Sequence, residues 1–368
     1  MTLILNNDEV SSLFDMEQAL ALLEDGYREL GEGRAVIRPR AHNYMNTNVP
    51  GVSYMFKSFE GGIERLGINA LRISSEHHQM HGGKVSGQTS SVASGKFLGL
   101  VLLFSTDSTE LLAIMPDGYI QSQRVGATWA IGAKYLARER CETIAIYGSG
   151  QQAPAFLEAH CRVRPTVKRV QVYSPTPEHR RAFAERMSRK LEIDVVPVDQ
   201  PRDAMRGADI VMSVNNAREP VVFSDWLEPG MHVCAISPGQ TNEEEFFKKV
   251  DVWVAHHRLT SMVFSSESYA HEDPRRRQRA KGSAEEVDLA AVPTLADLLC
   301  GRVSGRTDDR QITYFGGRNL GEMGEDSFGS SGTGIQFSAL GYDIYRRAKE
   351  LGIGHEIPSD WFLETLHP

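Results

Sequence analysis

The chain has few cysteines and no long apolar run. Its 368 residues include four cysteines, Cys141, Cys161, Cys234 and Cys300, and no two of them form a CxxC pair. Such wide spacing excludes a disulfide framework and a zinc site built on paired cysteines. No stretch is as long as a membrane span, and the N-terminus lacks the segments of a secretory signal. We therefore expect a cytoplasmic protein with no membrane partner.

The chain also lacks an excess of positive charge. It carries 40 lysines and arginines against 48 aspartates and glutamates, which gives a net charge of -8. The one basic run, RRRQR at 275–279, is short and lies near acidic residues. We therefore expect no nucleic-acid partner. The hydrophobic fraction of 41% is typical of a globular protein, and the length suits two domains.

Residues 143–159, TIAIYGSGQQAPAFLEA, have the pattern of a strand, a glycine loop and a helix. Gly148 permits a tight turn, Gly150 lets the backbone approach a pyrophosphate, and Ala153 lets the helix lie close to the strand. The helix N-terminus would attract phosphate. Alone, such a glycine pattern also occurs in ordinary turns between a strand and a helix. The expected phosphate-binding residues are Gly148, Ser149, Gly150, Gln151 and Gln152.

Strand and helix patterns alternate after this loop. Apolar strands are expected at 169–173, 195–198, 209–213, 231–236 and 250–254, and a helix at 177–191. Runs that are apolar on both faces favour a parallel sheet covered by helices on both sides. We therefore expect an α/β fold in which residues 129–329 form a Rossmann-type, doubly wound, NAD(P)-binding domain.

The end of the second strand of this domain bears on the choice of cofactor. An NAD site usually places a carboxylate there, whereas this chain has Tyr-Ser-Pro-Thr at 173–176. Ser174, Thr176 and Arg180 would instead receive a 2′-phosphate, which favours NADP over NAD. The alternative is that the arginines belong to a solvated helix face. Ser213, Ile236 and Ser237, near the ends of later strands, are further expected cofactor contacts.

The N-terminal part has a different pattern. A helix pair or one broken helix is expected at 8–30, followed by short strands at 52–59, 67–74, 97–104 and 111–115. The last two resemble a hairpin with its turn at 107–109. A helical stripe from Phe337 to Leu351 ends at Gly352 and would pack back on this part. Residues 1–128 plus 330–368 are therefore expected to form an α+β substrate-binding and dimerisation domain, and residues 256–310 to form loops and short helices.

Three arginines beside this region suggest recognition of a carboxylate. Arg40 begins the strand region, Arg72 lies within the apolar run INALRISS, and Arg124 lies in the segment that leads to the glycine loop. A buried arginine needs a carboxylate, from the protein or from a ligand. An internal salt bridge would explain each of them alone. All three near a nicotinamide site favour binding of an amino or imino acid, with Lys57 as a weaker substrate-binding candidate.

The run DGYIQSQRVGATWAIGAKYLARERCETIAIYGSGQQAPAFLEA resembles the ornithine cyclodeaminase and mu-crystallin family. The N-terminal NNDEVSSLFDMEQALALLEDGYREL and the FSALGYDIYRRAKELGIG helix fit the same family. The resemblance implies a homodimer, an NAD(P)-binding Rossmann domain and chemistry at the C–N bond of amino or imino acids. It also implies that Arg40 and Arg124 bind the substrate carboxylate, and that residues 148–152 form the phosphate loop.

Two positions depart from that family. The active-site lysine of the family has its best counterpart here in Arg72, which stays protonated and cannot shuttle a proton as lysine can. The cyclodeaminases carry an aspartate just before a Pro-Gly, where this chain has Ile236 and Ser237. Without that carboxylate a diamine such as ornithine loses its anchor. Ornithine cyclodeamination is therefore disfavoured.

Reduction of an imine would still need a proton donor. His77 and His78 are the catalytic candidates beside Arg72, with Glu76, His81 and Lys84 close by. The HHQMH segment does not have a known metal-ligand spacing, so no metal site is expected, and a plain polar loop is the alternative.

Three functions remain open at this point. The first is an NAD(P)H-dependent oxidoreductase acting on amino or imino acids, as an imine or ketimine reductase or an amino-acid dehydrogenase. The second is a cyclodeaminase with tightly bound NAD+. The third is a cofactor-dependent binding protein without catalysis, as in mu-crystallin.

Overall fold

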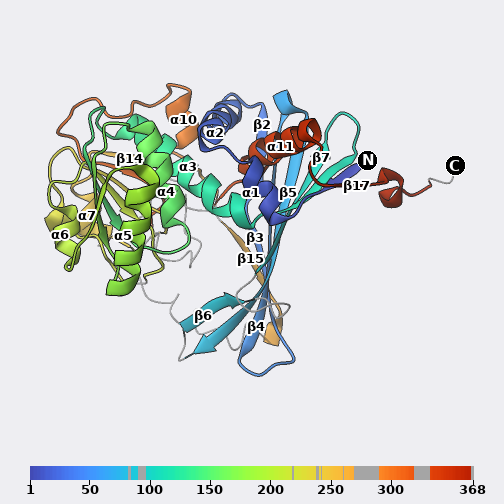
Figure 1. Ribbon diagram of the computed structural model, residues 1–368, viewed down its shortest axis with the longest axis horizontal. Helices are drawn as coiled ribbons and strands as arrows, with labels where there is room; N and C mark the ends of the chain where they lie inside the picture. Colours follow the sequence, from blue (N-terminus) through green and yellow to red (C-terminus); the bar gives the residue numbers. More distant parts are fainter. Residues whose placement is uncertain are drawn as a thin grey trace.

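A computed structural model gives the three-dimensional structure of the chain (Figure 1). The residues it describes are 1–81, 84–89, 97–217, 219–237, 240–241, 243–259, 261–268, 290–318 and 332–365. Two sheets lie side by side, and helix α3 (Gly118–Leu136) runs between them and contacts both. In the part of the chain described, no helix is long and apolar enough to cross a membrane.

The first sheet is mixed and has 10 strands in the main order β15-β3-β4-β5-β7-β8-β1-β17, with β2 paired to β4 and β6 to β5. It contains the hairpin of β7 and β8, as expected, with Thr109 in a left-handed conformation in the turn. The strands are β1 (Thr2–Ile4), β2 (Ala35–Ile37), β3 (Ala41–Asn46), β4 (Val52–Ile63), β5 (Ile68–His81), β6 (Lys84–Thr89), β7 (Leu98–Ser105), β8 (Leu111–Pro116), β15 (Met262–Ser265) and β17 (His355–Ile357).

Helices cover one face of this sheet. The expected N-terminal helix pair is confirmed as α1 (Asn7–Leu13) and α2 (Met16–Gly31), and the side chain of Asp15 caps α2 by accepting from Gln18 N. The C-terminal helix α11 (Gly334–Leu351) ends at Gly352 in a left-handed conformation and packs on β4 and β5. Its Phe337 ring meets the Phe59 ring edge to face, at 5.4 Å between centroids. The hydrophobic core of this part of the molecule therefore lies between the first sheet and the helices α2 and α11.

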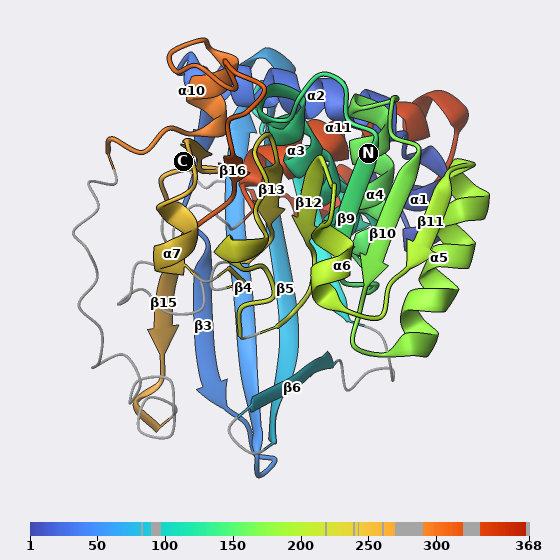
Figure 2. The same ribbon diagram turned by 90° about the vertical axis from the view of Figure 1, so that its left-hand side faces the viewer.

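The second sheet is parallel and has 7 strands in the order β11-β10-β9-β12-β13-β16-β14 (Figure 2). This arrangement confirms the Rossmann-type expectation. The strands are β9 (Thr143–Tyr147), β10 (Arg169–Tyr173), β11 (Asp194–Pro197), β12 (Ile210–Ser213), β13 (His232–Ala235), β14 (Val252–Val254) and β16 (Thr313–Phe315), and the helices of this part of the chain are α4 (Ala153–Val163), α5 (Pro177–Leu191), α6 (Pro201–Met205), α7 (Glu243–Phe247) and α10 (Leu295–Leu299).

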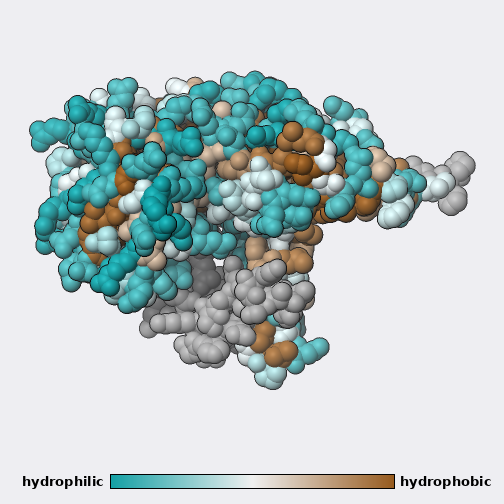
Figure 3. All heavy atoms as spheres, viewed as in Figure 1, coloured by the Kyte–Doolittle hydropathy of each residue, from teal (hydrophilic) through white to brown (hydrophobic). Residues whose placement is uncertain are grey.

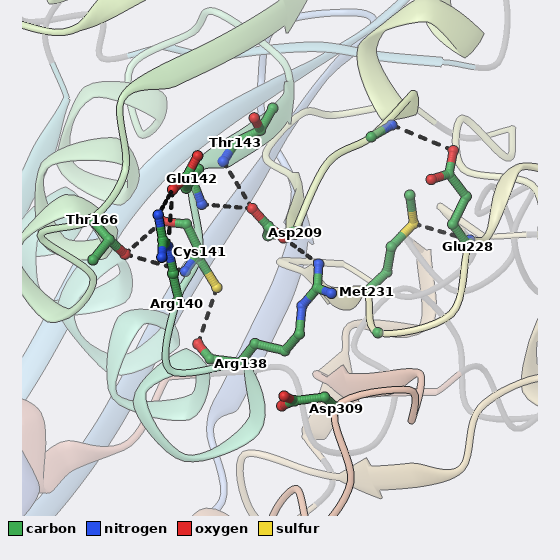
Figure 4. A network of polar contacts seen from close by, with 12 residues as sticks. Arg138, Arg140, Cys141, Glu142, Thr143, Thr166, Asp209, Glu228, Met231 and Asp309 are labelled. Carbon is green, nitrogen blue, oxygen red and sulfur yellow. Dashed lines mark hydrogen bonds and ion pairs between the residues drawn. The ribbon is translucent and has the colours of Figure 1, made fainter.

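Asp209 ties together the beginnings of the two central strands, β9 and β12 (Figure 4). Its Oδ2 accepts hydrogen bonds from the backbone N–H groups of Glu142, at 2.6 Å, and Thr143, at 2.9 Å. Its Oδ1 accepts from the guanidinium of Arg138 at the end of α3. These contacts fix β9 relative to β12, and both strands end at the glycine loop.

Two strands of the structure were not predicted from the sequence. Strand β15 lies within residues 129–329, but it pairs in parallel with β3 of the first sheet. Strand β16 was not predicted, because three residues are too few for a periodic pattern, yet it lies between β13 and β14. The chain therefore crosses back to the first sheet between β14 and β16.

Candidate functional site

A cavity of about 270 Å³ lies between the first sheet, α3 and the glycine loop. Its lining includes all four residues expected to bind substrate and the last two residues of the expected phosphate loop. These residues are Arg40, Lys57, Arg72 and Arg124, with Gln151 and Gln152 from the loop after β9. Positions distant in the sequence thus meet in one pocket.

Strand alternation decides which side chains of β5 face this cavity. Arg72, Ser74 and Glu76 are buried on one face, and Lys57 of β4 pairs with Ser74, which places it on the same face. His77 points to the opposite face, where its ring lies 6.3 Å from the Tyr54 ring between centroids. The structure therefore does not bring His77 together with the arginines. The side chain of His78 lies outside the described residues.

Arg72 forms an internal ion pair. Its Nε donates to Oδ2 of Asp117 at 2.5 Å, and the Asp117 side chain is fully buried at the start of α3. Its Nη1 donates to Oγ of Ser74 at 3.1 Å, and that hydroxyl donates to Oε1 of Glu76 at 2.7 Å. Arg72 therefore forms the internal salt bridge that was the alternative to substrate binding. Arg72 also forms part of the cavity wall.

Arg124 has a different set of partners. Its Nη1 donates to Oε1 of Gln336 and its Nη2 to Oε1 of Gln121, both at 2.8 Å. The residue is only 3% exposed, and its Nε has no hydrogen-bond partner among the described residues. Burial lowers the pKa of Arg124 to about 9, with smaller contributions from the charges of Arg40 and Arg72. A buried cation held by two neutral amides favours an anionic ligand.

The three arginines lie against two aromatic rings, Phe59 of β4 and Phe337 of α11. The guanidinium carbons of Arg40 and Arg72 each lie 5.4 Å from the centre of the Phe59 ring. The guanidinium carbon of Arg124 lies 5.3 Å from the Phe337 ring. Such cation–π contacts help to hold the guanidinium groups in place beside the cavity.

Gln336 and Gln121 were not predicted from the sequence. Gln121 lies one turn before Arg124 on α3, so this spacing was available as a signal. Gln336 lies 212 residues from Arg124 in the chain, and no local pattern indicates that pairing. Its Nε2 donates to Oγ1 of Thr128 at 2.7 Å, so the amide is held at both ends.

The glycine loop follows β9 and has an open backbone at its second glycine. Gly148 has φ +121°, and a Cβ there would lie 2.0 Å from the carbonyl oxygen of Val214, so only glycine fits. At Gly150 a Cβ would meet nothing within 4 Å, which leaves that backbone open to approach. Ser149, between them, is partly exposed, and Gln152 directly precedes α4. The loop and the N-terminus of α4 therefore fit a pyrophosphate.

The expected 2′-phosphate region lies at the end of β10. Ser174 is buried, and its carbonyl accepts from Nη1 of Arg180 at 2.9 Å. The Nη2 of Arg180 pairs with Asp199, whose side chain is 84% exposed. Thr176 is exposed just before α5. Arg180 is therefore shared with a carboxylate, which the sequence pattern did not reveal.

The three remaining cofactor candidates lie at the ends of β12 and β13. Ser213 at the end of β12 is buried and donates to Oε1 of Gln240 at 2.7 Å. Ile236 N donates to the Ser213 carbonyl at 3.1 Å, and Ser237 follows it, partly exposed. All three lie near the carboxyl ends of the parallel strands, where cofactors bind in this class of sheet.

Known proteins match the chain over almost its full length. Delta(1)-pyrroline-2-carboxylate reductase of Bacillus cereus is 25% identical over 361 residues, covering 96% of this chain and 99% of that protein. The solved reductase of the same name from Thermococcus litoralis, in complex with NADH and L-proline, is 23% identical, with a TM-score of 0.75 over 97% of this chain and 100% of that one. An archaeal alanine dehydrogenase dimer with bound NAD is 25% identical, with a TM-score of 0.73 over 97% and 99% of the two chains.

The family model described as "Ornithine cyclodeaminase/mu-crystallin family" matches residues 1–321. This match includes the glycine loop, all three arginines of the cavity and both sheets up to β16. The chain therefore belongs to the ornithine cyclodeaminase/mu-crystallin family.

Proposed function

We propose that the protein is an NAD(P)H-dependent oxidoreductase that reduces the C=N bond of an imino acid or, in reverse, oxidises an amino acid. The observation that carries this proposal is the buried guanidinium of Arg124, which donates to the neutral amides of Gln336 and Gln121, in a cavity that reaches Gln151 and Gln152 of the glycine loop. A substrate carboxylate on Arg124 would place the neighbouring C–N bond beside the cofactor site.

The names of the relatives agree with this class of reaction. The Bacillus relative is a pyrroline-carboxylate reductase, and the archaeal structure is an alanine dehydrogenase. Both names describe reactions in which a carboxylate is next to a carbon bonded to nitrogen. When bound, the nicotinamide cofactor supplies the hydride for such a reduction. The chain itself supplies binding and orientation, through Arg40 and Arg124 on the carboxylate and residues 148–152 on the phosphates.

Cyclodeamination with tightly bound NAD+ is the second candidate, because the family includes ornithine cyclodeaminase. The segment after β13 argues against a diamine substrate. Ile236 and Ser237 stand there, and neither side chain can bind a second ammonium group as a carboxylate would. A non-catalytic binding protein, as in mu-crystallin, is the third candidate.

For the cofactor, we propose a preference for NADPH over NADH. No carboxylate stands at 173–176 to repel a 2′-phosphate, and the guanidinium of Arg180 lies against the carbonyl of Ser174. The pairing of Arg180 with Asp199 limits this preference, because a phosphate would share the guanidinium with a carboxylate.

For the assembly, we propose a homodimer formed through the face of the first sheet that α2 and α11 leave uncovered. Cross-strand pairs such as Leu71 with Leu102 and Ile73 with Leu100 lie on that face and are only partly buried. A separate hydrophobic area lies over α11, on the side of the sheet that the helices cover (Figure 3), and Leu351 of α11 is 66% exposed. Light scattering of the purified protein should give twice the mass of the chain, and Leu102→Glu should give monomers. A wild-type monomer would contradict the proposal.

The experiment that tests the proposed function uses purified protein with NADPH or NADH. Cyclic ketimine carboxylates, and 2-oxo acids with ammonia or methylamine, are supplied as substrates, and loss of the reduced nicotinamide absorbance is followed. Oxidation that depends on one substrate is expected. No oxidation with any substrate, together with ammonia release from an amino acid under NAD+, would support the cyclodeaminase instead. Absence of both cofactor oxidation and ammonia release would support the non-catalytic binding protein.

A further inference from the structure

Lys57 and Glu76 form a charged pair on the cavity wall. We propose that Lys57 donates the proton that the substrate nitrogen takes up during imine reduction. Glu76 holds the ammonium group of Lys57 in place for this step. This inference rests on the proposed function, and it assigns to Lys57 the role that the sequence suggested for His77.

The composition of the cavity wall supports Lys57 by elimination. Lys57 and Glu76 are the two described lining residues whose side chains belong to the usual general acids and bases of proteins. The remaining described lining residues are arginines, phenylalanines, glutamines and one serine. Arg72 is tied to Asp117, and Arg124, whose pKa burial lowers to about 9, is assigned to the substrate carboxylate, whose negative charge favours the protonated guanidinium. His77 lies on the opposite face of β5 and contacts Tyr54.

The geometry of the pair fits a donor with a supporting carboxylate. Nζ of Lys57 lies 3.4 Å from the carboxylate of Glu76, and the two side chains are 14% and 2% exposed. Lys57 is therefore the more exposed member of the pair. Glu76 is held from behind by Ser74, whose hydroxyl also accepts from Arg72. A chain of contacts thus fixes Glu76 relative to the Arg72–Asp117 pair.

The position of Lys57 also explains how the site can work with arginine at position 72. By resemblance, Arg72 occupies the position of the family's active-site lysine. In the structure, Arg72 is paired with Asp117. Lys57 lies on the adjacent strand β4, on the same face of the sheet. A titratable amine is therefore one strand away from the position that lost it.

The proton step balances with the proposed reduction. The C=N double bond becomes a single bond as its carbon receives a hydride from the reduced nicotinamide cofactor and its nitrogen receives a proton. That proton leaves Nζ of Lys57, which becomes a neutral amine and then regains a proton from water. Glu76 stays ionised throughout and favours the reloaded ammonium by its negative charge.

Two substitutions separate proton donation from charge. Lys57→Arg keeps a cation that can attract a carboxylate but cannot donate its proton at neutral pH. We expect kcat to fall about 100-fold in Lys57→Arg and in Lys57→Met, because positioned general acids contribute at least that much. In Lys57→Arg the KM should stay within about threefold of the wild type, since the charge is kept. In the wild type, kcat should decline at alkaline pH as Lys57 loses its proton. This decline should be absent from Lys57→Arg.

A measurement without turnover tests the role of Glu76. The pKa of the Lys57 amine can be followed by NMR of lysine side chains in the cofactor-free protein, with Lys57→Arg identifying the signal. Glu76→Gln should lower that pKa, because it removes the neighbouring negative charge. An unchanged pKa would overturn the role of Glu76.

The kinetic outcomes distinguish this inference from the proposed function. An active wild type with an equally active Lys57→Arg would show that Lys57 only binds charge, and would overturn the proton role alone. A wild type that reduces no imine would contradict the proposed function and the proton role together. Thermal unfolding of both variants at the wild-type temperature would establish that lost activity is not lost folding.

Discussion

The Nε of Arg72 donates to Oδ2 of Asp117 at 2.5 Å, and this buried ion pair joins strand β5 to the beginning of α3. Burial raises the pKa of Asp117, while the charge of Arg72 opposes that shift. The pair therefore depends on the presence of both partners. It also fixes the cavity wall on which Ser74 and Glu76 stand.

Asp117→Asn should destabilise the protein strongly. The change leaves the guanidinium of Arg72 buried without its carboxylate, which typically costs about 3–5 kcal/mol in the free energy of unfolding. Urea denaturation of the two proteins measures the difference. Asp360→Asn, at an exposed position, is the matched control and should change stability by less than about 0.5 kcal/mol. Equal stabilities for Asp117→Asn and the wild type would contradict this view of the pair.

Gln336→Glu should weaken binding of the substrate carboxylate. The new carboxylate would stand where Oε1 of Gln336 now accepts from Arg124, and would neutralise the charge that we assign to the substrate. We expect KM to rise at least about tenfold, which corresponds to about 1.4 kcal/mol of lost binding. Gln336→Met removes the hydrogen bonds without adding charge and should raise KM less. A wild-type KM in Gln336→Glu would show that Arg124 does not bind the carboxylate.

Ser174→Asp should weaken NADPH binding by about tenfold or more and spare NADH, because a carboxylate at the end of β10 repels a 2′-phosphate. Asp199→Ala should act in the opposite direction, since it releases Arg180 from its carboxylate partner. Titration of each protein with both cofactors, followed by fluorescence, gives the dissociation constants. Unchanged NADPH binding in Ser174→Asp would place the 2′-phosphate elsewhere.

The buried His160 should make the protein sensitive to acid. Burial lowers the pKa of His160 from 6.5 to about 4, and Nδ1 donates to the carbonyl of Phe156 at 2.7 Å. Between pH 6.5 and 4 the unfolded chain binds a proton that the folded chain does not, so stability falls as the pH drops through this window. The loss attributable to His160 is about 3 kcal/mol.

The His160 prediction can be checked with one variant. The free energy of unfolding of the wild type and of His160→Gln is measured by urea denaturation at several pH values between 6.5 and 4. The variant should show a shallower dependence on pH, because it lacks one group that binds a proton on unfolding. Identical slopes would mean that His160 is not the group responsible.

The glycine loop and its strands were predictable from the sequence because their signals are local. Gly148 is required by a backbone φ of +121° and by the nearby Val214 carbonyl, and strand β10 matches the predicted residues 169–173. The extension of β5 through His77 was not predicted, because its residues beyond Ser74 are polar and lack an apolar alternation. The roles of His77 on β5 and Lys57 on β4 depend on which face of the sheet each one occupies.

The contacts around the arginines needed the structure. The Arg72–Asp117 pair spans 45 residues and the Arg124–Gln336 contact spans 212. Sequence reasoning identified the arginines, since a cation in an apolar strand needs a partner, but no local spacing names the partner. The same limit applies to β15, which pairs with β3 from a distant part of the chain.

The central claim is a net reduction of a C=N bond in the cavity of Arg124, and the most direct test is the stoichiometry of one reaction mixture. Reduced cofactor consumed, amine formed and ammonia released are measured together for the substrate that the wild type prefers. With a preformed ketimine, the account predicts one cofactor oxidised for each amine formed, and no release of ammonia. Release of ammonia from an amino acid without net change in the cofactor would contradict it and identify a cyclodeaminase.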